Sequence, residues 1–175
     1  SGAVSIAKVS AGTADDHLKT AVTIGGGNTF AAQNINFAAN SNITESMDMD
    51  ALAISGYAAL GGNSTTSEAY ADATVTAEAG NTYKGSDNNA GNVSFNANNT
   101  VTQTADTSGI SAAGLFATGT NIGNTISNLT TKVDIKGSST ESNINDLDAT
   151  ASSYASVSNT VNGDGGSIAD ISPYA

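Results

Sequence analysis

The chain has 175 residues and a net charge of −11, with 16 acidic residues against five basic ones. This balance argues against a nucleic-acid-binding protein, because phosphate binding needs clustered positive charge. Ala, Gly, Ser, Thr and Asn fill 112 positions, while Leu, Ile, Val and Phe fill only 31, so any core must be thin. Cysteine is absent, and no segment approaches the roughly 20 apolar residues of a membrane span.

Short runs of alternating apolar and polar residues predict β-strands along the chain. No apolar stripe with helical spacing is sustained, so no long helix is expected. The run from Ala69 to Ala77 places alanines and Val75 on one side, which suits a narrow interior. In chain order, the predicted strands are centred on 4–6, 22–24, 35–37, 69–77, 93–95, 101–102 and 133–135.

Stretches rich in glycine and asparagine predict turns between these strands, because both residues tolerate positive φ. The stretch 84–91 is the most loop-like, and residues 164–175 are expected to form a terminal tail or linker. The predicted turns are 25–28, 61–63, 86–92, 119–121 and 162–166.

An internal repeat is the most informative feature of the chain. The sequence Asn-Ile-Asn-Phe at 34–37 recurs as Asn-Val-Ser-Phe at 92–95, and this offset of 58 gives 11 identities in the 47 ungapped positions from 34 to 80. Residues 22–29 resemble 75–82 at an offset of 53, and Asn-Ile-Asn returns at 143–145. Fixed spacing of this kind indicates a repeat architecture. The predicted units are 1–33 (partial), 34–91, 92–142 and 143–163 (partial), before the tail at 164–175.

We therefore predict an all-β fold, a parallel β-helix (β-solenoid) with coils of about 19 residues, three to each repeat of 51–58 residues; two coils of about 29 are the alternative. Recurrent asparagines favour it, because identical amides stacked coil over coil can form hydrogen-bonded ladders. The residues expected to face inward are Val22, Ile35, Phe37, Ile43, Ile54, Val75, Val93, Phe95, Val101, Ile110, Leu115 and Val133.

Two stretches of the chain resemble a known family. Residues 54–63 followed by 69–78, and 110–121 followed by 128–135, resemble units of filamentous haemagglutinin-like proteins, including the leukotoxin-type filamentous adhesins of bacteria. The resemblance covers roughly residues 20–160 and lies in style and periodicity. It implies a right-handed parallel β-helix shaft exposed at a bacterial surface.

No catalytic or cofactor-binding constellation is expected. His17 is the only histidine and is interpreted as a solvent-exposed loop residue, and the three glycines at 25–27 lack the lysine of a phosphate loop. Paired aspartates could offer oxygen ligands to calcium, or act as in glycosidases, although the default interpretation is a solubilising acidic surface. The candidate metal ligands are Asp48, Asp50, Asp146 and Asp148.

Two surface motifs remain open. Spaced threonines at 74–76, 100–104 and 118–120 are the kind of array that an ice-binding solenoid presents, but they do not recur in every copy. Glycosylation sequons occur at Asn42, Asn63, Asn92, Asn98 and Asn128.

The sequence thus predicts a structural, non-enzymatic segment of a secreted bacterial filament or surface adhesin, acting in adhesion or biofilm assembly. Its expected partners are copies of itself, adjoining coils of a longer chain, or a host or neighbouring cell surface. Exposed coil ends would allow end-to-end β-stacking. The alternative is a calcium- or carbohydrate-binding β-domain.

Overall fold

A computed structural model describes residues 2–86, 89–137, 140–166 and 169–171. The described residues form β-strands and no helix, as the sequence predicts. The strands are β1 (Gly2–Ala11), β2 (Leu18–Ile24), β3 (Thr29–Ala31), β4 (Asn34–Ser55), β5 (Ala58–Ala77), β6 (Thr82–Lys84), β7 (Gly91–Ala113), β8 (Phe116–Ile135), β9 (Thr140–Ser142), β10 (Ile144–Gly166) and β11 (Ala169–Ile171).

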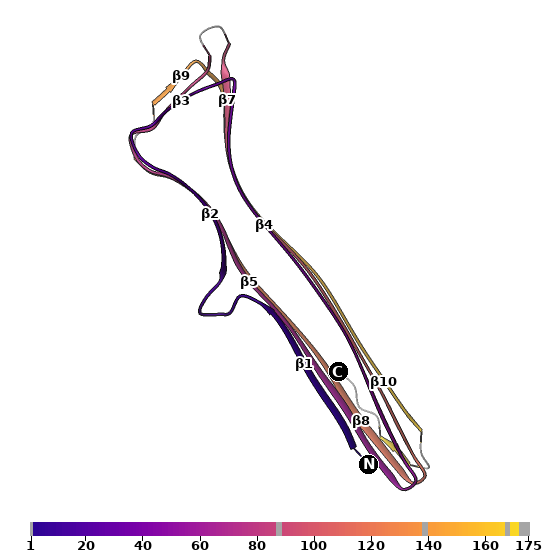
Figure 1. The fold of residues 1–175 in the computed structure, drawn as a ribbon. Coiled ribbons are helices and arrows are strands. Elements are labelled where there is room, and N and C mark those ends of the chain that lie inside the picture. Colours follow the sequence, from indigo (N-terminus) through magenta and orange to yellow (C-terminus); the bar gives the residue numbers. More distant parts are fainter. Residues whose placement is uncertain (1, 87–88, 138–139, 167–168, 172–175) are drawn as a thin grey trace.

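The strands form three parallel sheets. The five-stranded sheet has the order β1-β5-β8-β11, with β2 also paired to β5; the long three-stranded sheet has the order β10-β7-β4, and the short one β3-β6-β9. The two large sheets run side by side and converge at a narrow end, while the short sheet closes the wide end (Figure 1). All-β parallel sheets of this kind are compatible with a β-solenoid.

The pairing register reproduces the offset found in the sequence. Asn34 pairs with Asn92, and the same offset holds to the end of β4 and throughout β5 with β8. We call the strands of one sequence repeat a level, and each level pairs with the level of the next repeat. Paired residues are a whole repeat apart, as Asn34 and Asn92 or Leu18 and Ala71 are, so the predicted coil of about 19 residues is wrong. The strands instead continue without interruption for 20 to 23 residues, since alternation of inner and outer side chains continues through their Asn, Ser and Thr residues.

In the first levels the offset changes where a loop gains residues. It falls from 58 to 53 between β1 and β2, because residues 12–17 form an extra loop beside β5. It rises again across 84–91, the segment that the sequence marks as the most loop-like. In the last level Asn92 pairs with Asp146 rather than with Asn143, the partner that the Asn-Ile-Asn motif suggests, after an irregularity between Ile144 and Asp146.

Three glycines make equivalent corners at the wide end. Gly27, Gly80 and Gly137 have φ of 77°, 81° and 67°, values that favour glycine. The expected turn at 25–28 is thus confirmed, but 61–63, 119–121 and 162–166 lie inside strands. The narrow end turns at 56–57 and 114–115 instead. The expected tail also differs, since 164–166 and 169–171 pair with β7 and β8.

The apolar core lies at the wide end. Val75, Val93, Phe95 and Tyr83 are at most 1% exposed, and the Phe95 ring stacks on Phe37 with centroids 5.4 Å apart. Towards the narrow end the inner row becomes small, because Ala69, Ala71 and Ala73 are fully buried as the sequence predicts.

Most of the predicted inward residues are confirmed. Val22, Phe37 and Val133 are only partly buried but pack against the core. Ile54, Ile110 and Leu115 are wrong, with exposures of 65%, 51% and 37%. Ile54 lies eleven residues after the buried Ile43, and Ile110 nine after the buried Val101, and an odd separation on a strand reverses the face. Leu115 lies in the turn at the narrow end.

Candidate functional site

The narrow half of the interior is polar rather than apolar. Thr65 and Thr107, both fully buried, face each other across the two sheets with their hydroxyl oxygens 2.6 Å apart. Alternation turns these small polar side chains inward, and hydrogen bonds between the sheets compensate for their burial.

A cluster of four side chains, three of them buried and the fourth, Ser127, exposed, extends this polar interior. Glu45 is 5% exposed, and its Oε2 accepts hydrogen bonds from Ser67 Oγ at 2.5 Å and from Gln103 Nε2 at 2.9 Å. Gln103 also donates to the Ile126 carbonyl, and its Oε1 accepts a bond from Ser127. We name Glu45, Ser67, Gln103 and Ser127 the buried polar cluster. It ties β4 and β7 of one sheet to β5 and β8 of the other.

Glycines inside the strands make room for inner side chains. A Cβ on Gly61 would lie 2.5 Å from Ser111 Oγ, and one on Gly109 would lie 2.6 Å from Asn121 Oδ1. Asn121 in turn donates to the carbonyl of Asn162 on the opposite sheet. Gly61, which lies in a stretch that suggests a turn in the sequence, therefore serves sheet-to-sheet packing instead.

The outer face of the long three-stranded sheet carries an amide ladder. Asn145 Nδ2 donates to Asn92 Oδ1 at 3.2 Å, and Asn92 Nδ2 donates to Asn34 Oδ1 at 3.3 Å. Ser94 extends the pattern by donating to Asn36 at 2.9 Å. The amide ladders expected from the recurrent asparagines are therefore confirmed at this position.

Both edges of the long three-stranded sheet are open among the described residues. Within that sheet β4 pairs only with β7 on one side, and β10 pairs only with β7 on the other. These edges are 22 and 23 residues long. Backbone N–H and C=O groups along such edges can pair with another strand.

The candidate metal ligands lie on two different strands. Asp48 and Asp50 are exposed on β4, and Asp146 and Asp148 are exposed on β10, with β7 between them. The structure therefore does not bring the four together. Among the described residues no group of three or more His, Asp or Glu side chains is placed to hold a metal ion. Asp106 pairs in register with Asp48, a neighbour that the repeat offset already indicates.

His17 is more enclosed than the sequence suggests. Its side chain is 16% exposed, and Nδ1 lies 2.7 Å from Asp72 Oδ1. Its ring centroid is 5.6 Å from that of Tyr70, whose residue is 8% exposed. The contact pins the extra loop at 12–17 against β5, so a structural role replaces the expected solvent-exposed one.

The glycosylation sequons differ in exposure, and the spaced threonines differ in the residues with which they pair. Asn63 is 3% exposed and donates to the Ser108 carbonyl, so this sequon is closed to modification in the folded chain. Asn42, Asn92 and Asn128 are exposed and Asn98 is partly exposed. Of the spaced threonines, Thr102 pairs in register with Thr44, while Thr100 pairs with Asn42.

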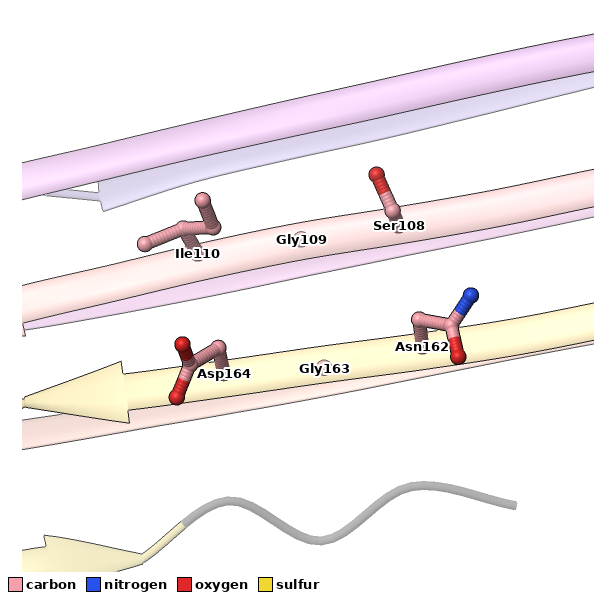
Figure 2. Close-up of a pocket in the computed structure, with 6 residues that line it drawn as sticks. All are labelled: Ser108, Gly109, Ile110, Asn162, Gly163 and Asp164. Carbon is pink, nitrogen blue, oxygen red and sulfur yellow. The ribbon is translucent and has the colours of Figure 1, made fainter.

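A shallow hollow of about 160 Å³ lies between β7 and β10. Figure 2 shows Gly109 and Gly163 side by side on adjacent strands, with Ser108, Ile110, Asn162 and Asp164 around them. The Cβ that Gly109 lacks would point inward at Asn121, so the hollow lies on the outer face, between the register pair of Ser108 with Asn162 and the register pair of Ile110 with Asp164. The arrangement offers a carboxylate, an amide and a hydroxyl to a small polar ligand.

Few side chains have shifted acidities. Burial raises the pKa of Tyr83 above its usual 10.0, while the Asn81 side chain partly opposes the shift. The hydrogen bond from Lys132 lowers the pKa of Asp134, and the hydrogen bond to Glu78 raises the pKa of Lys136. Lys136 follows β8 and Glu78 follows the neighbouring β5, so this ion pair joins two levels of the five-stranded sheet.

Comparisons of the chain with protein-family models, with curated proteins and with solved structures find no match. The part of the chain that the structure describes holds no helix that is long and apolar enough to span a membrane. The geometry of the strands and their side chains is therefore the basis for a functional assignment.

Proposed function

We propose that the chain is a structural segment of an extracellular bacterial filament or large surface adhesin, without enzymatic activity. Its levels of paired strands would form a β-solenoid with one coil per sequence repeat. In this proposal the segment acts by extending a shaft in adhesion or biofilm assembly, through end-to-end β-stacking on adjoining coils or on another copy.

The open strand edges are the observation that carries the proposal. A long, flat edge is an aggregation hazard in a monomeric protein unless charges, prolines or bulges protect it. Neither β4 nor β10 contains a lysine or a proline, and the one irregularity in β10 lies at its first residues. The charges on each strand are three carboxylates, so their positions decide whether the edges can pair. Such edges suit a chain in which further strands pair with β4 and β10.

The chemistry of the two edges is compatible with stacking. If β4 of a second copy continued the observed registers, no carboxylate would meet another. Asn36 would then lie beside Asp148, and the amide ladder would continue. Each carboxylate of β4 would lie beside an uncharged residue of β10: Glu45 beside Val157, Asp48 beside Thr160 and Asp50 beside Asn162.

Electron microscopy of the purified chain tests the proposal. We expect concentration-dependent growth of uniform filaments, whereas compact particles at every concentration would contradict stacking. Val157, on the inner row of β10, is 49% exposed, and Glu45 of a stacked copy would lie beside it. Val157→Glu should therefore leave the fold intact but place two carboxylates side by side where the next coil would pack. Ser158→Glu, on the outer face of the same strand, is the matched control. Only the first variant should block growth.

The alternative function, a ligand-binding β-domain, is favoured by one observation, the hollow beside Asp164. Titration calorimetry with calcium and binding to a glycan array would test it. Binding that Asp164→Asn abolishes would favour the alternative over a shaft.

A further inference from the structure

The outer face of the five-stranded sheet is apolar near the narrow end. Five large side chains stand there on three adjacent strands, with exposures from 48% to 78%. We name them the distal apolar face: Val4, Ile6, Leu60, Phe116 and Ile122. At roughly 200 Å² for a large apolar side chain, these exposures leave on the order of 600 Å² of apolar surface in water.

Strands β1, β5 and β8 carry no charge on this part of the sheet, and Asp170 of the adjoining β11 pairs in register with the buried Ala117, not with a residue of this face. Residues 2–7, 51–67 and 107–131 contain no Asp, Glu, Lys or Arg, although the chain carries a net charge of −11. The nearest charges on the same face are Lys8 and Glu68, which neutralise each other with Nζ and Oε2 2.8 Å apart. Two copies of so acidic a chain repel each other elsewhere, but here they can approach closely.

Large and small residues alternate across the face. The register places Leu60 between Gly2 and Thr118, and Ser64 between Ile6 and Ile122. In the row between them, Gly62 separates Val4 from Thr120. Projecting side chains therefore alternate with hollows on a flat sheet, which is the relief that lets two sheet faces interdigitate about 10 Å apart.

We propose that the distal apolar face binds the same face of a second copy, sheet against sheet, about a two-fold axis. Three observations support a copy of this chain as the partner. The five side chains form an uncharged face within an acidic molecule, its large and small residues alternate, and its apolar area approaches the roughly 800 Å² that each partner gives to a standard interface. This lateral contact is independent of stacking along the strand edges, because it uses side chains that point away from both edges.

The stacking-blocked variant Val157→Glu isolates the lateral contact. We expect it to sediment as a dimer, and we expect adding Ile6→Thr and Leu60→Thr to raise the dimer dissociation constant at least tenfold. The matched control adds Leu52→Thr and Ile110→Thr, two exposed aliphatic residues on the outer face of the other sheet at the same end. Threonine keeps the strand preference in both pairs, and circular dichroism checks the fold.

The outcomes separate the possibilities. A dimer that only Ile6→Thr with Leu60→Thr weakens supports the proposal. A monomer at all concentrations, or equal weakening by both pairs, overturns it. Flotation with neutral lipid vesicles without dimerisation would assign the face to a lipid surface and also overturn it. If Val157→Glu fails to fold, filaments of the unmodified chain serve instead. Paired filaments that become single with Ile6→Thr and Leu60→Thr support the contact, and filaments that are already single refute it.

Discussion

Replacing Gln103 with methionine tests whether the buried polar cluster holds the two sheets together. Gln103 is fully buried, and its side chain bonds to Glu45, Ser67, Ser127 and the Ile126 carbonyl. Methionine has a similar length but can make none of these bonds. The substitution would leave the Glu45 carboxylate with Ser67 as its one remaining donor in the cluster.

The expected loss follows from the kinds of bond removed. A hydrogen bond to a charged group contributes about 1.5–3 kcal/mol and a neutral one about 1 kcal/mol, and unpaired buried groups add a penalty. We expect Gln103→Met to lower the free energy of unfolding by about 3–5 kcal/mol, a large part of the roughly 5–15 kcal/mol of a typical domain.

Urea unfolding followed by circular dichroism measures this loss, and an unchanged m-value would show that the unfolded state is unaffected. Glu45→Met and the double variant complete a cycle. Because removing both partners leaves no unpaired carboxylate, the double variant should lose much less than the two single losses combined. Additive losses, or a change below about 0.5 kcal/mol for Gln103→Met, would refute the reasoning.

Three further predictions concern single residues. Phe95→Ala should destabilise the chain by about 3–5 kcal/mol in urea unfolding, because Phe95 is fully buried against the rings of Phe37 and Tyr83; a loss below about 1 kcal/mol would place the main core elsewhere. Gly109→Ala should destabilise by about 1–3 kcal/mol, because the new methyl group meets Asn121, which its bond to Asn162 holds in place, whereas Asn121→Ala should relieve that clash. Burial raises the pKa of Tyr83, so the folded state holds the phenol proton more tightly than the unfolded chain does. The free energy of unfolding should therefore fall as the pH rises from about 10 through the folded pKa. In alkaline unfolding, Tyr83→Phe should remove this dependence on pH.

The register could be read from the sequence, but the coil length could not. Identities at an offset of 58 fix which strands pair, because parallel stacking rewards like residues side by side. They do not say where the chain turns inside the repeat. Turn prediction then failed at Gly61 and Gly119, which look like corners but lie within strands where Ser111 needs space. The real turn at 56–57 contains one glycine and no asparagine.

The polar interior escaped prediction for a related reason. Glu45, Ser67 and Gln103 are residues that usually face water, so an apolar pattern does not mark them as buried. Parity could have found them, since each lies an even number of residues from a buried apolar position: Glu45 from Ile43, Ser67 from Ala69 and Gln103 from Val101. The same parity would have excluded Ile54 and Ile110 from the core.

The long strands also determine how such a shaft would bend. A strand of 22 residues spans about 70 Å, while two facing sheets lie about 10 Å apart. The cross-section of such a shaft is therefore much deeper along the strands than it is thick. At equal cross-sectional area, the bending stiffness of a beam grows with the square of its depth in the plane of bending. Bending edgewise would be roughly fifty times harder than bending across the flat. A shaft built from these levels would bend readily across its thin dimension and resist bending along its strands.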